Sequence, residues 1–201
     1  MNYLISALIG YLLGSFNTAY LLSKAKGFDI RDKGTHNPGA SNVTITLGWK
    51  FGIITALFDI LKASLAVVIA QTIFKNVENV GLVSGIMAVF GHMYPIYLKF
   101  QGGKGFASYI GMILAIDWKF ALILMVVCAL ITIITDYIAI ATMFAVIFFP
   151  IYYYLYNDIS FVFIGLVALS LLIVFKHRKN VINIINGDEI GLRSVGKNKN
   201  T

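Results

Sequence analysis

Charged residues, cysteines and long polar stretches are all scarce in this 201-residue sequence. Charged side chains make up only 12% of the chain, whereas about a quarter is typical of soluble proteins. The polar stretches fall short of the roughly 50 residues that the smallest domains need, which excludes a separate soluble domain. Cys128 has no second cysteine to pair with, which excludes a disulfide scaffold, and we expect it to be a buried packing residue. The composition predicts an integral membrane protein with a single domain over residues 1–201.

Hydrophobic residues make up 59% of the chain and gather in seven runs, each of which predicts a membrane-spanning helix. A helix needs about 20 residues to cross a hydrocarbon core about 30 Å thick. The first run has no basic residues in front of it, so we expect a retained span and not a signal peptide. The predicted fold class is an all-α, polytopic bundle of seven transmembrane helices. The runs are 3–22, 51–74, 80–98, 106–116, 119–135, 137–156 and 159–176.

The net charge of +7 is explained by the order of the predicted spans. Lys and Arg residues accumulate beside spans on the cytoplasmic side. If the N-terminus is outside, the outer connections hold only Lys75 and Lys119, and the basic C-terminal tail is cytoplasmic. Omitting the short run 106–116 would place that tail outside, against the rule. Nucleic-acid binding is not expected, because the basic residues follow the membrane topology. The basic residues predicted inside are Lys24, Lys26, Arg31, Lys33, Lys50, Lys99, Lys104, Lys176, Arg178, Lys179, Arg193, Lys197 and Lys199.

Three polar segments then fall on the cytoplasmic side: 29–42, 99–105 and 177–189. In the first, Gly34 and Gly39 allow backbone geometries with positive φ, so that successive N–H groups can point into one concavity that suits an anion. A turn-rich loop between two helices is the other interpretation. The side chains that add hydrogen-bond donors are Thr35, Asn37, Ser41 and Asn42.

The second segment contains the sequence GGKG, in which Gly102 and Gly103 precede Lys104. Glycines let the backbone approach a ligand closely, and the ammonium group supplies positive charge. The segment lacks the GxxxxGK[ST] spacing of a nucleotide-binding loop. It predicts either a phosphate cradle or a flexible basic loop.

In the third segment, His177 and Asn180 are three residues apart and so lie on one face of a helix. Histidine can act as a base near neutral pH, and an asparagine amide can donate to an oxyanion. The neighbouring basic residues are also typical of the end of a membrane span. The segment therefore predicts either a reacting centre or stop-transfer charges.

Ionisable residues inside the predicted spans are costly and usually mark a function or a partner. Asp59 and Lys62 are spaced to pair on one helix face, or one of them reaches a polar cavity. His92 lies just before Pro95 and the GGKG sequence; either it is a hydrogen-bonded packing residue or it has a role beside that loop. The pair Gly10 and Gly14 has the spacing that lets helix backbones pack closely.

Taken together, four motifs resemble those of the bacterial acyl-phosphate:glycerol-3-phosphate acyltransferase family, PlsY. The family patterns GSGNxGATN, DxxKG, GHxxPxxxxFxGGKG and HRxN are similar to stretches of this chain in the same order. The third is the most specific, and the resemblance covers nearly the whole chain. The corresponding stretches are GTHNPGASN at 34–42, DILKA at 59–63, GHMYPIYLKFQGGKG at 91–105, and HRKNVINIINGDE at 177–189.

The resemblance implies a seven-span enzyme of the bacterial plasma membrane with its active site on the cytoplasmic side. It would transfer an acyl chain from acyl phosphate to the 1-hydroxyl of glycerol 3-phosphate, making lysophosphatidic acid and inorganic phosphate in the first step of phospholipid synthesis. The partners are these two substrates and membrane lipid; no cofactor, metal or nucleic acid is expected, and no protein partner is inferred. The implied catalytic residues are His177, Asn180 and Lys104, and the implied substrate-binding residues are Thr35, Asn37, Gly39, Asn42, Lys62, Gly102 and Gly103.

The chain departs from the family pattern at Ile45, where family members carry Arg. The departure leaves three outcomes open: weak activity, another phosphate-bearing acceptor, or compensation by Arg31 or His36. A catalytically inactive paralogue is therefore one alternative. A transporter of a phosphorylated solute is another, but the short outer connections carry little polar chemistry.

Overall fold

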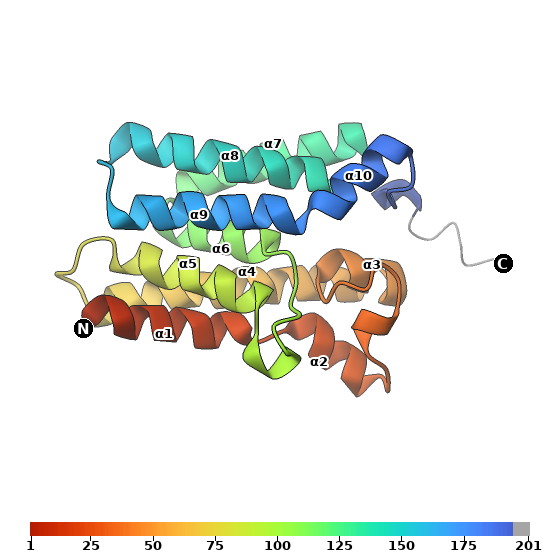
Figure 1. The fold of residues 1–201 in the computed structure, drawn as a ribbon, viewed down its shortest axis with the longest axis horizontal. Helices are drawn as coiled ribbons and strands as arrows, with labels where there is room; N and C mark the ends of the chain where they lie inside the picture. The colour runs from red at the N-terminus through yellow and green to blue at the C-terminus, as the bar shows by residue number, and fades with distance from the viewer. Residues whose placement is uncertain (195–201) are drawn as a thin grey trace. The chain divides into compact units, whose positions relative to one another are not determined.

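The computed structural model describes residues 1–194 and divides into two compact units, Met1–Trp118 and Lys119–Thr201. Every regular element in the described residues is helical, which confirms the predicted all-α class (Figure 1). All seven apolar runs contain helices. Two residues of the predicted basic tail, Lys197 and Lys199, lie outside the described residues.

The helices of the first unit follow the first four apolar runs, with an extra helix between the first two. The first run breaks at Asn17, whose extended backbone starts a new helix and whose side-chain oxygen accepts from the Tyr20 N–H at 2.9 Å. The extra helix belongs to the polar segment 29–42 and its continuation. The elements are α1 (Asn2–Ser15), α2 (Thr18–Ala25), η1 (Ile30–Asp32), α3 (Ala40–Leu47), α4 (Trp49–Ile73), α5 (Val80–Met93), η2 (Ile96–Leu98) and α6 (Phe106–Ile116).

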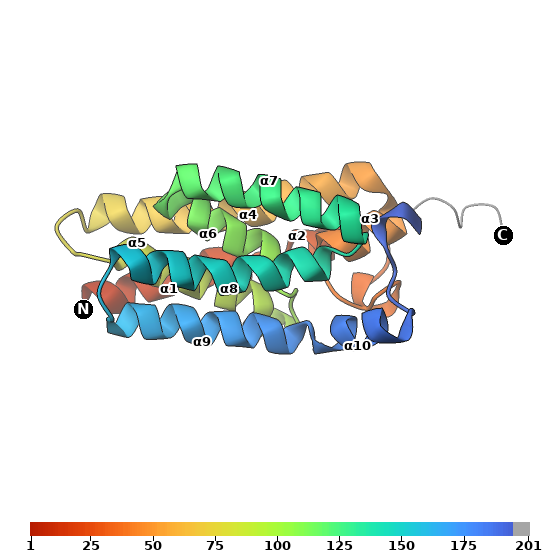
Figure 2. The same cartoon turned by 90° about the horizontal axis from the view of Figure 1, so that it is seen from above.

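Within this unit α1, α4 and α5 pack side by side, and α6 packs on α4 and α5 (Figures 1 and 2). Glycines in α1 let its backbone come close to that of α5. A Cβ on Gly10 or Gly14 would collide with the backbone of Ser84 or Ala88 in α5. The small-residue spacing therefore serves close helix packing, as predicted.

The second unit contains the last three apolar runs. Between α7 (Trp118–Thr135) and α8 (Ile138–Tyr156), the Phe120 and Tyr152 rings stack with their centroids 3.9 Å apart. Cys128 is 5% exposed, and its Sγ donates to the Ala141 carbonyl at 3.5 Å, which confirms a buried packing residue. The elements are α7 (Trp118–Thr135), α8 (Ile138–Tyr156), α9 (Phe161–Lys176), α10 (Arg178–Asn186) and η3 (Leu192–Ser194).

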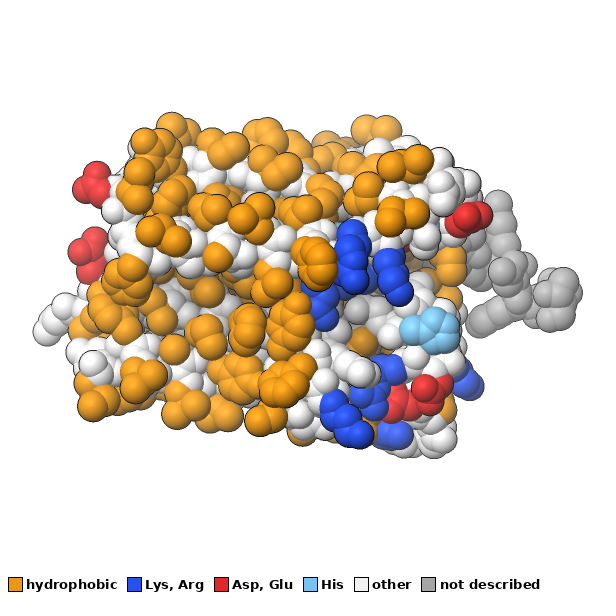
Figure 3. Space-filling model, viewed as in Figure 1, with side chains coloured by type: hydrophobic (Ala, Val, Ile, Leu, Met, Phe, Trp, Pro, Cys, Tyr) orange, Lys and Arg blue, Asp and Glu red, His pale blue; other side chains and the backbone are white. Residues whose placement is uncertain are grey.

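Five candidate spans among the described residues are long and apolar enough to cross a membrane, and a sixth forms if α9 and α10, bent by 42°, count as one. Helix α6 has only 11 residues, about 16 Å of rise, or roughly half of a hydrocarbon core. Hydrophobic side chains make up most of what is visible in Figure 3. The chain is an all-helical integral membrane protein, and the count of seven spans stays a prediction.

Candidate functional site

The side chain of Asn42 holds the first polar segment together from inside. It is fully buried, and its oxygen accepts from the Thr35 N–H at 2.8 Å. Its amide nitrogen donates to the carbonyls of Ile30 at 3.0 Å and Lys33 at 2.9 Å. The side-chain oxygen and nitrogen of Asn42 both bond to the backbone of this segment, so Asn42 stabilises the shape of the loop.

The glycines of this segment differ in their backbone geometry. Gly34 has a φ of 60°, which is the left-handed conformation expected from the sequence. Gly39 instead has a φ of −144° and is extended, because it is the N-cap of α3. Thr35 is exposed, and Asn37 is half-buried beside Gly39. Of the two glycines that allow a positive φ, Gly34 adopts one and Gly39 does not.

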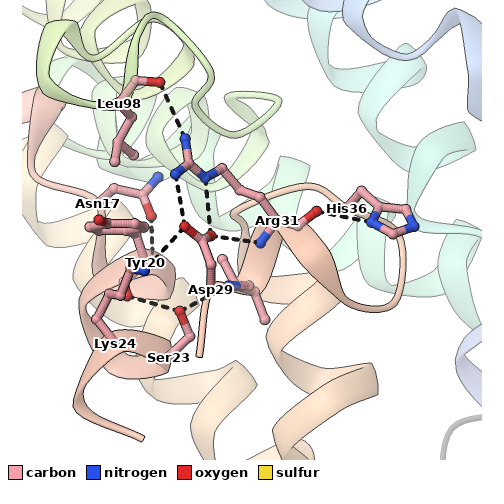
Figure 4. A network of polar contacts seen from close by, with 9 residues as sticks. Asn17, Tyr20, Ser23, Lys24, Asp29, Arg31, His36 and Leu98 are labelled. Atoms are coloured by element: carbon pink, nitrogen blue, oxygen red, sulfur yellow. Dashed lines mark hydrogen bonds and ion pairs between the residues drawn. The ribbon is translucent and has the colours of Figure 1, made fainter. Parts of the chain in front are cut away.

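Asp29 and Arg31 form the charged centre of the same segment (Figure 4). Arg31 donates to both carboxylate oxygens of Asp29, at 3.0 Å from Nε and 2.8 Å from Nη2. These hydrogen bonds hold the pKa of the Asp29 carboxyl well below its usual range, and the same pair raises the pKa of Arg31. The third Arg31 nitrogen, Nη1, donates to the carbonyl of Leu98, the residue just before the segment 99–105, at 3.4 Å. The two polar segments of this unit are therefore neighbours.

Neither Arg31 nor His36, the two residues considered as compensation, is a simple replacement for the Arg that Ile45 displaces. The Arg31 guanidinium is neutralised by Asp29. His36 is exposed with a φ of 58°, and its Nδ1 lies 2.9 Å from the Arg31 carbonyl. A carbonyl oxygen only accepts, so Nδ1 carries the hydrogen of this bond. Of the two, His36 keeps a ring edge directed away from the Asp29–Arg31 pair (Figure 4).

The GGKG sequence folds back onto the end of α5. The Gly102 N–H donates to the Met93 carbonyl and the Gly103 N–H to the His92 carbonyl, both at 3.1 Å. Both glycines are buried, and Lys104 is half-buried. The closest approaches of both glycines are to α5 and Pro95, so here the glycines permit tight backbone packing.

Asp59 and Lys62 form the predicted pair, at 2.7 Å between Asp59 Oδ1 and Lys62 Nζ. The Lys62 ammonium also donates to the Phe16 carbonyl at 2.6 Å and contacts His92 Nδ1 at 2.8 Å. Protein groups therefore surround the ammonium of Lys62. Its predicted contact with substrate stays a prediction.

The second unit contains the third polar segment. His177 joins α9 to α10, is 4% exposed, and its Nδ1 lies 2.9 Å from the Ile173 carbonyl, to which it must donate. Asn180 donates to Glu189 Oε1 at 2.5 Å, and Asn183 donates to the other oxygen at 3.3 Å. Glu189 thereby orients the predicted catalytic amide.

Asp136 holds the chain that follows Glu189. Its carbonyl accepts from the Leu192 N–H at 3.1 Å and its carboxylate from the Arg193 N–H at 2.8 Å. The Arg193 side chain also donates to the Ile133 carbonyl. Residues 191–193 are therefore fastened to the turn between α7 and α8.

Comparison with known proteins identifies the family of this chain. Residues 4–187 match the family described as glycerol-3-phosphate acyltransferase. The chain belongs to this family. It is 39% identical to glycerol-3-phosphate acyltransferase 1 of Oceanobacillus iheyensis, with 97% of each chain covered, and 37% identical to the enzyme of Thermosipho melanesiensis, with 94% and 92% covered. The family resemblance of the sequence is confirmed.

Two solved structures of the family are also similar. The crystal structure of PlsY, an integral membrane glycerol 3-phosphate acyltransferase, has a TM-score of 0.88 in its glycerol 3-phosphate form, with 31% identity and 96% of this chain and 97% of that chain covered. Its lysophosphatidic acid form has a TM-score of 0.84, also at 31% identity, with 95% of each chain covered. The similarity extends over both units.

Two polar residues, one in each unit, hold loops in place, and the sequence analysis assigned no such role to either. Asn17 is 1% exposed, and its amide donates to the Pro38 carbonyl at 3.1 Å, while its N–H donates to the Tyr97 hydroxyl at 2.9 Å. A polar residue between two apolar stretches was the signal for this role. Asp136, an acidic residue that interrupts an apolar run, was a similar signal for the contact with Leu192 and Arg193.

Proposed function

We propose that this chain transfers a fatty acyl group from an acyl phosphate to the 1-hydroxyl of glycerol 3-phosphate, giving lysophosphatidic acid and inorganic phosphate. The observation that carries the proposal is the family match over residues 4–187. The similarity to PlsY in its glycerol 3-phosphate and lysophosphatidic acid forms supports this acceptor and this product. The reaction belongs to phospholipid synthesis in the membrane.

The reaction needs no covalent enzyme intermediate, because an acyl phosphate is already activated. The acceptor hydroxyl attacks the carbonyl carbon, a new C–O ester bond forms, and the bond from that carbon to the phosphate oxygen breaks. The phosphate leaves with the electron pair. The hydroxyl proton passes either to the His177 ring or directly to a phosphate oxygen.

The anionic substrates require positive charge and hydrogen-bond donors. We assign this role to Lys104 and to the side chains of Thr35 and Asn37. The N–H groups of Gly39, Gly102 and Gly103 donate to protein carbonyls, so these glycines shape the two loops around the substrates. Lys104 and Asn37 are half-buried and Thr35 is exposed. Asn42 and Lys62, which the motifs also mark, support the surrounding loop and helices through the contacts described above.

His177 and Asn180 are assigned to the reacting centre. Since His177 Nδ1 donates to the Ile173 carbonyl, the neutral ring presents Nε2 as its accepting nitrogen. The Asn180 amide is oriented by Glu189 and can donate to the oxygen on which negative charge develops. Neither residue needs a metal ion for these roles.

We propose a seven-span topology with the N-terminus outside and the active site on the cytoplasmic side. The distribution of Lys and Arg supports this orientation. In a variant in which Cys128 is replaced by Ala, a single cysteine introduced by Lys75→Cys should react with an impermeant thiol reagent added to intact cells. A cysteine introduced by Lys99→Cys should react only after permeabilisation. The reverse pattern would contradict the orientation.

The reaction is tested with purified protein in lipid, given acyl phosphate and glycerol 3-phosphate. We expect stoichiometric release of phosphate and formation of lysophosphatidic acid, and no product when acyl-CoA replaces acyl phosphate. Lys104→Ala and His177→Ala should each lower turnover by about 100-fold or more. Full activity in both variants would refute the site assignment.

Matched controls remove neighbouring charges. Lys99→Asn removes a positive charge from the same loop, and asparagine tolerates the φ of 54° at that position. Lys179→Ala removes an exposed charge two residues after His177. Both controls should retain turnover close to that of the unchanged protein.

A family member that binds a phosphate-bearing ligand without turnover is a second candidate. Ile45 favours it, because it stands where the family pattern has Arg, and Asp29 already neutralises Arg31. This candidate predicts that glycerol 3-phosphate raises the melting temperature of the protein while no phosphate is released from acyl phosphate.

A further inference from the structure

Three ionisable side chains meet inside the first unit, between α4 and α5. Asp59 and Lys62 lie one turn apart on α4, and His92 lies near the end of α5. Their residues are 2%, 7% and 3% exposed, respectively. Charges buried in this way are stable only when they are paired and hydrogen-bonded, so the geometry around each one is restricted.

The hydrogen bonds of Lys62 determine which ring nitrogen of His92 carries a hydrogen. An ammonium group has three N–H donors and no acceptor. Around Lys62 Nζ lie Asp59 Oδ1 at 2.7 Å, the Phe16 carbonyl at 2.6 Å and His92 Nδ1 at 2.8 Å. His92 Nδ1 therefore accepts, and the ring hydrogen is on Nε2. His92 Nδ1 also lies 3.4 Å from Asp59 Oδ1, but the shorter contact of 2.8 Å is with the ammonium group, which can only donate.

The other edge of the same ring lies against the GGKG backbone. A Cβ on Gly103 would collide with His92 Nε2 and lie 2.8 Å from Cε1. The Gly103 N–H donates to the His92 carbonyl at 3.1 Å, so main chain and side chain of one residue hold this glycine. Lys104 follows immediately.

We propose that His92 is a positioning residue. Its ring is held by Lys62, which is paired with Asp59, and the ring in turn fixes the backbone at Gly103 and thereby the position of the Lys104 ammonium. A network of paired, buried polar groups in a low-dielectric interior restricts the positions of its members, and positioning of a charged group to within a fraction of an ångström decides its contribution to catalysis. On this proposal Lys62 acts through His92. The kinetic part rests on the proposed function, and the structural part does not.

The central variants separate the hydrogen bond from the ring. His92→Phe keeps a ring against Gly103 but removes the acceptor for Lys62. His92→Asn keeps an oxygen near the place of Nδ1. Thr55→Val is the matched control, because Thr55 is fully buried on α4, and its hydroxyl donates to the Phe51 carbonyl of its own helix.

The first measurement is hydrogen exchange of the peptide that spans residues 101–105. We expect its amides to exchange about tenfold faster or more in His92→Phe, with a smaller increase in His92→Asn and none in Thr55→Val. Unchanged exchange in both His92 variants overturns the proposal. If His92→Phe fails to fold, the comparison of His92→Asn with Thr55→Val decides it.

The second measurement is a double-mutant cycle on kcat/KM for glycerol 3-phosphate. His92→Phe alone should lower this ratio on the order of 100-fold, and His92→Asn should recover part of the loss. When His92→Phe is added to Lys104→Arg, the additional fall in kcat/KM should be much smaller, because both substitutions disturb the position of the same charged group. Fully additive losses would show a role independent of Lys104 and overturn the proposal. A wild-type chain without acyltransferase activity refutes the proposed function, while the exchange result still decides the positioning.

Discussion

The side-chain oxygen of Asn42 accepts a hydrogen bond from the backbone N–H of Thr35 at 2.8 Å, and this bond closes the first polar segment on itself. The amide nitrogen of the same side chain faces two carbonyls. A residue that the motif marks as a ligand is thus a fixed internal support for the residues around it. In the same segment Thr35 is exposed and Asn37 is half-buried.

The Asn42→Asp variant tests this support. The substitution preserves the shape but turns a donor into an oxygen that faces the carbonyls of Ile30 and Lys33. Buried polar groups without partners cost about 1–3 kcal/mol each. We expect the free energy of unfolding to fall by about 2–4 kcal/mol, measured by thermal and denaturant unfolding in detergent. Ser41→Ala, at the exposed neighbouring position, should change it by less than about 0.5 kcal/mol. Equal stability of the two variants would contradict the role.

Glu189 orients Asn180, and Glu189→Gln tests the contact. Glutamine has an NH₂ group in place of one carboxylate oxygen. Its one remaining oxygen cannot replace the two separate acceptors that Asn180 and Asn183 use. Loss of one hydrogen bond to a charged group corresponds to about a tenfold fall in kcat. Steady-state kinetics measure it, and Asp188→Asn, which removes a charge from the exposed preceding residue, is the control. A fall of the same size in both variants would indicate a charge effect and not orientation.

Restoration of a cation at position 45 should strengthen substrate binding. Ile45 is half-buried on α3, and a guanidinium there offers a planar pair of donors to a phosphate. We expect Ile45→Arg to raise kcat/KM for glycerol 3-phosphate about tenfold, measured by phosphate release. Ile45→Leu is the control for altered packing. An unchanged or lower ratio in Ile45→Arg would mean that the missing Arg does not limit this protein.

The pair of Asp29 and Arg31 predicts a dependence of stability on acid. The pKa of Asp29 is lowered in the folded protein, so the pair stabilises the fold fully above the carboxyl's ordinary pKa, and this contribution is lost as the pH falls toward the lower folded value. Asp29→Asn should therefore lower the melting temperature at about pH 7 and have a smaller effect at about pH 3.

The control for this pH dependence is Asp32→Asn, an exposed carboxylate on the same turn. Its melting temperature should follow that of the unchanged protein across the same pH range. A constant difference between Asp29→Asn and the unchanged protein at both pH values would contradict the assignment, because a linked protonation requires the difference to change.

Local signals account for the parts of the fold that were correctly predicted. Apolar runs predicted helices, and Gly34 predicted a left-handed backbone, since both depend on near neighbours along the chain. The break at Asn17 was missed because the surrounding apolar run is long enough for a continuous span. Helix α3 (Ala40–Leu47) was missed because its first residues are small and polar, which also fits a loop. The extended backbone at Gly39 follows from its position before that helix.

The sequence alone determined that this chain is an all-helical membrane protein, and its ordered motifs identified its family. Composition and periodicity carry that information because the bilayer requires apolar helices of a certain length. Only the tertiary structure decided which marked residues support the site internally. The partners of Lys62 are 30 and 46 residues away along the chain, at His92 and Phe16, and a contact over that distance exists only once the helices have packed.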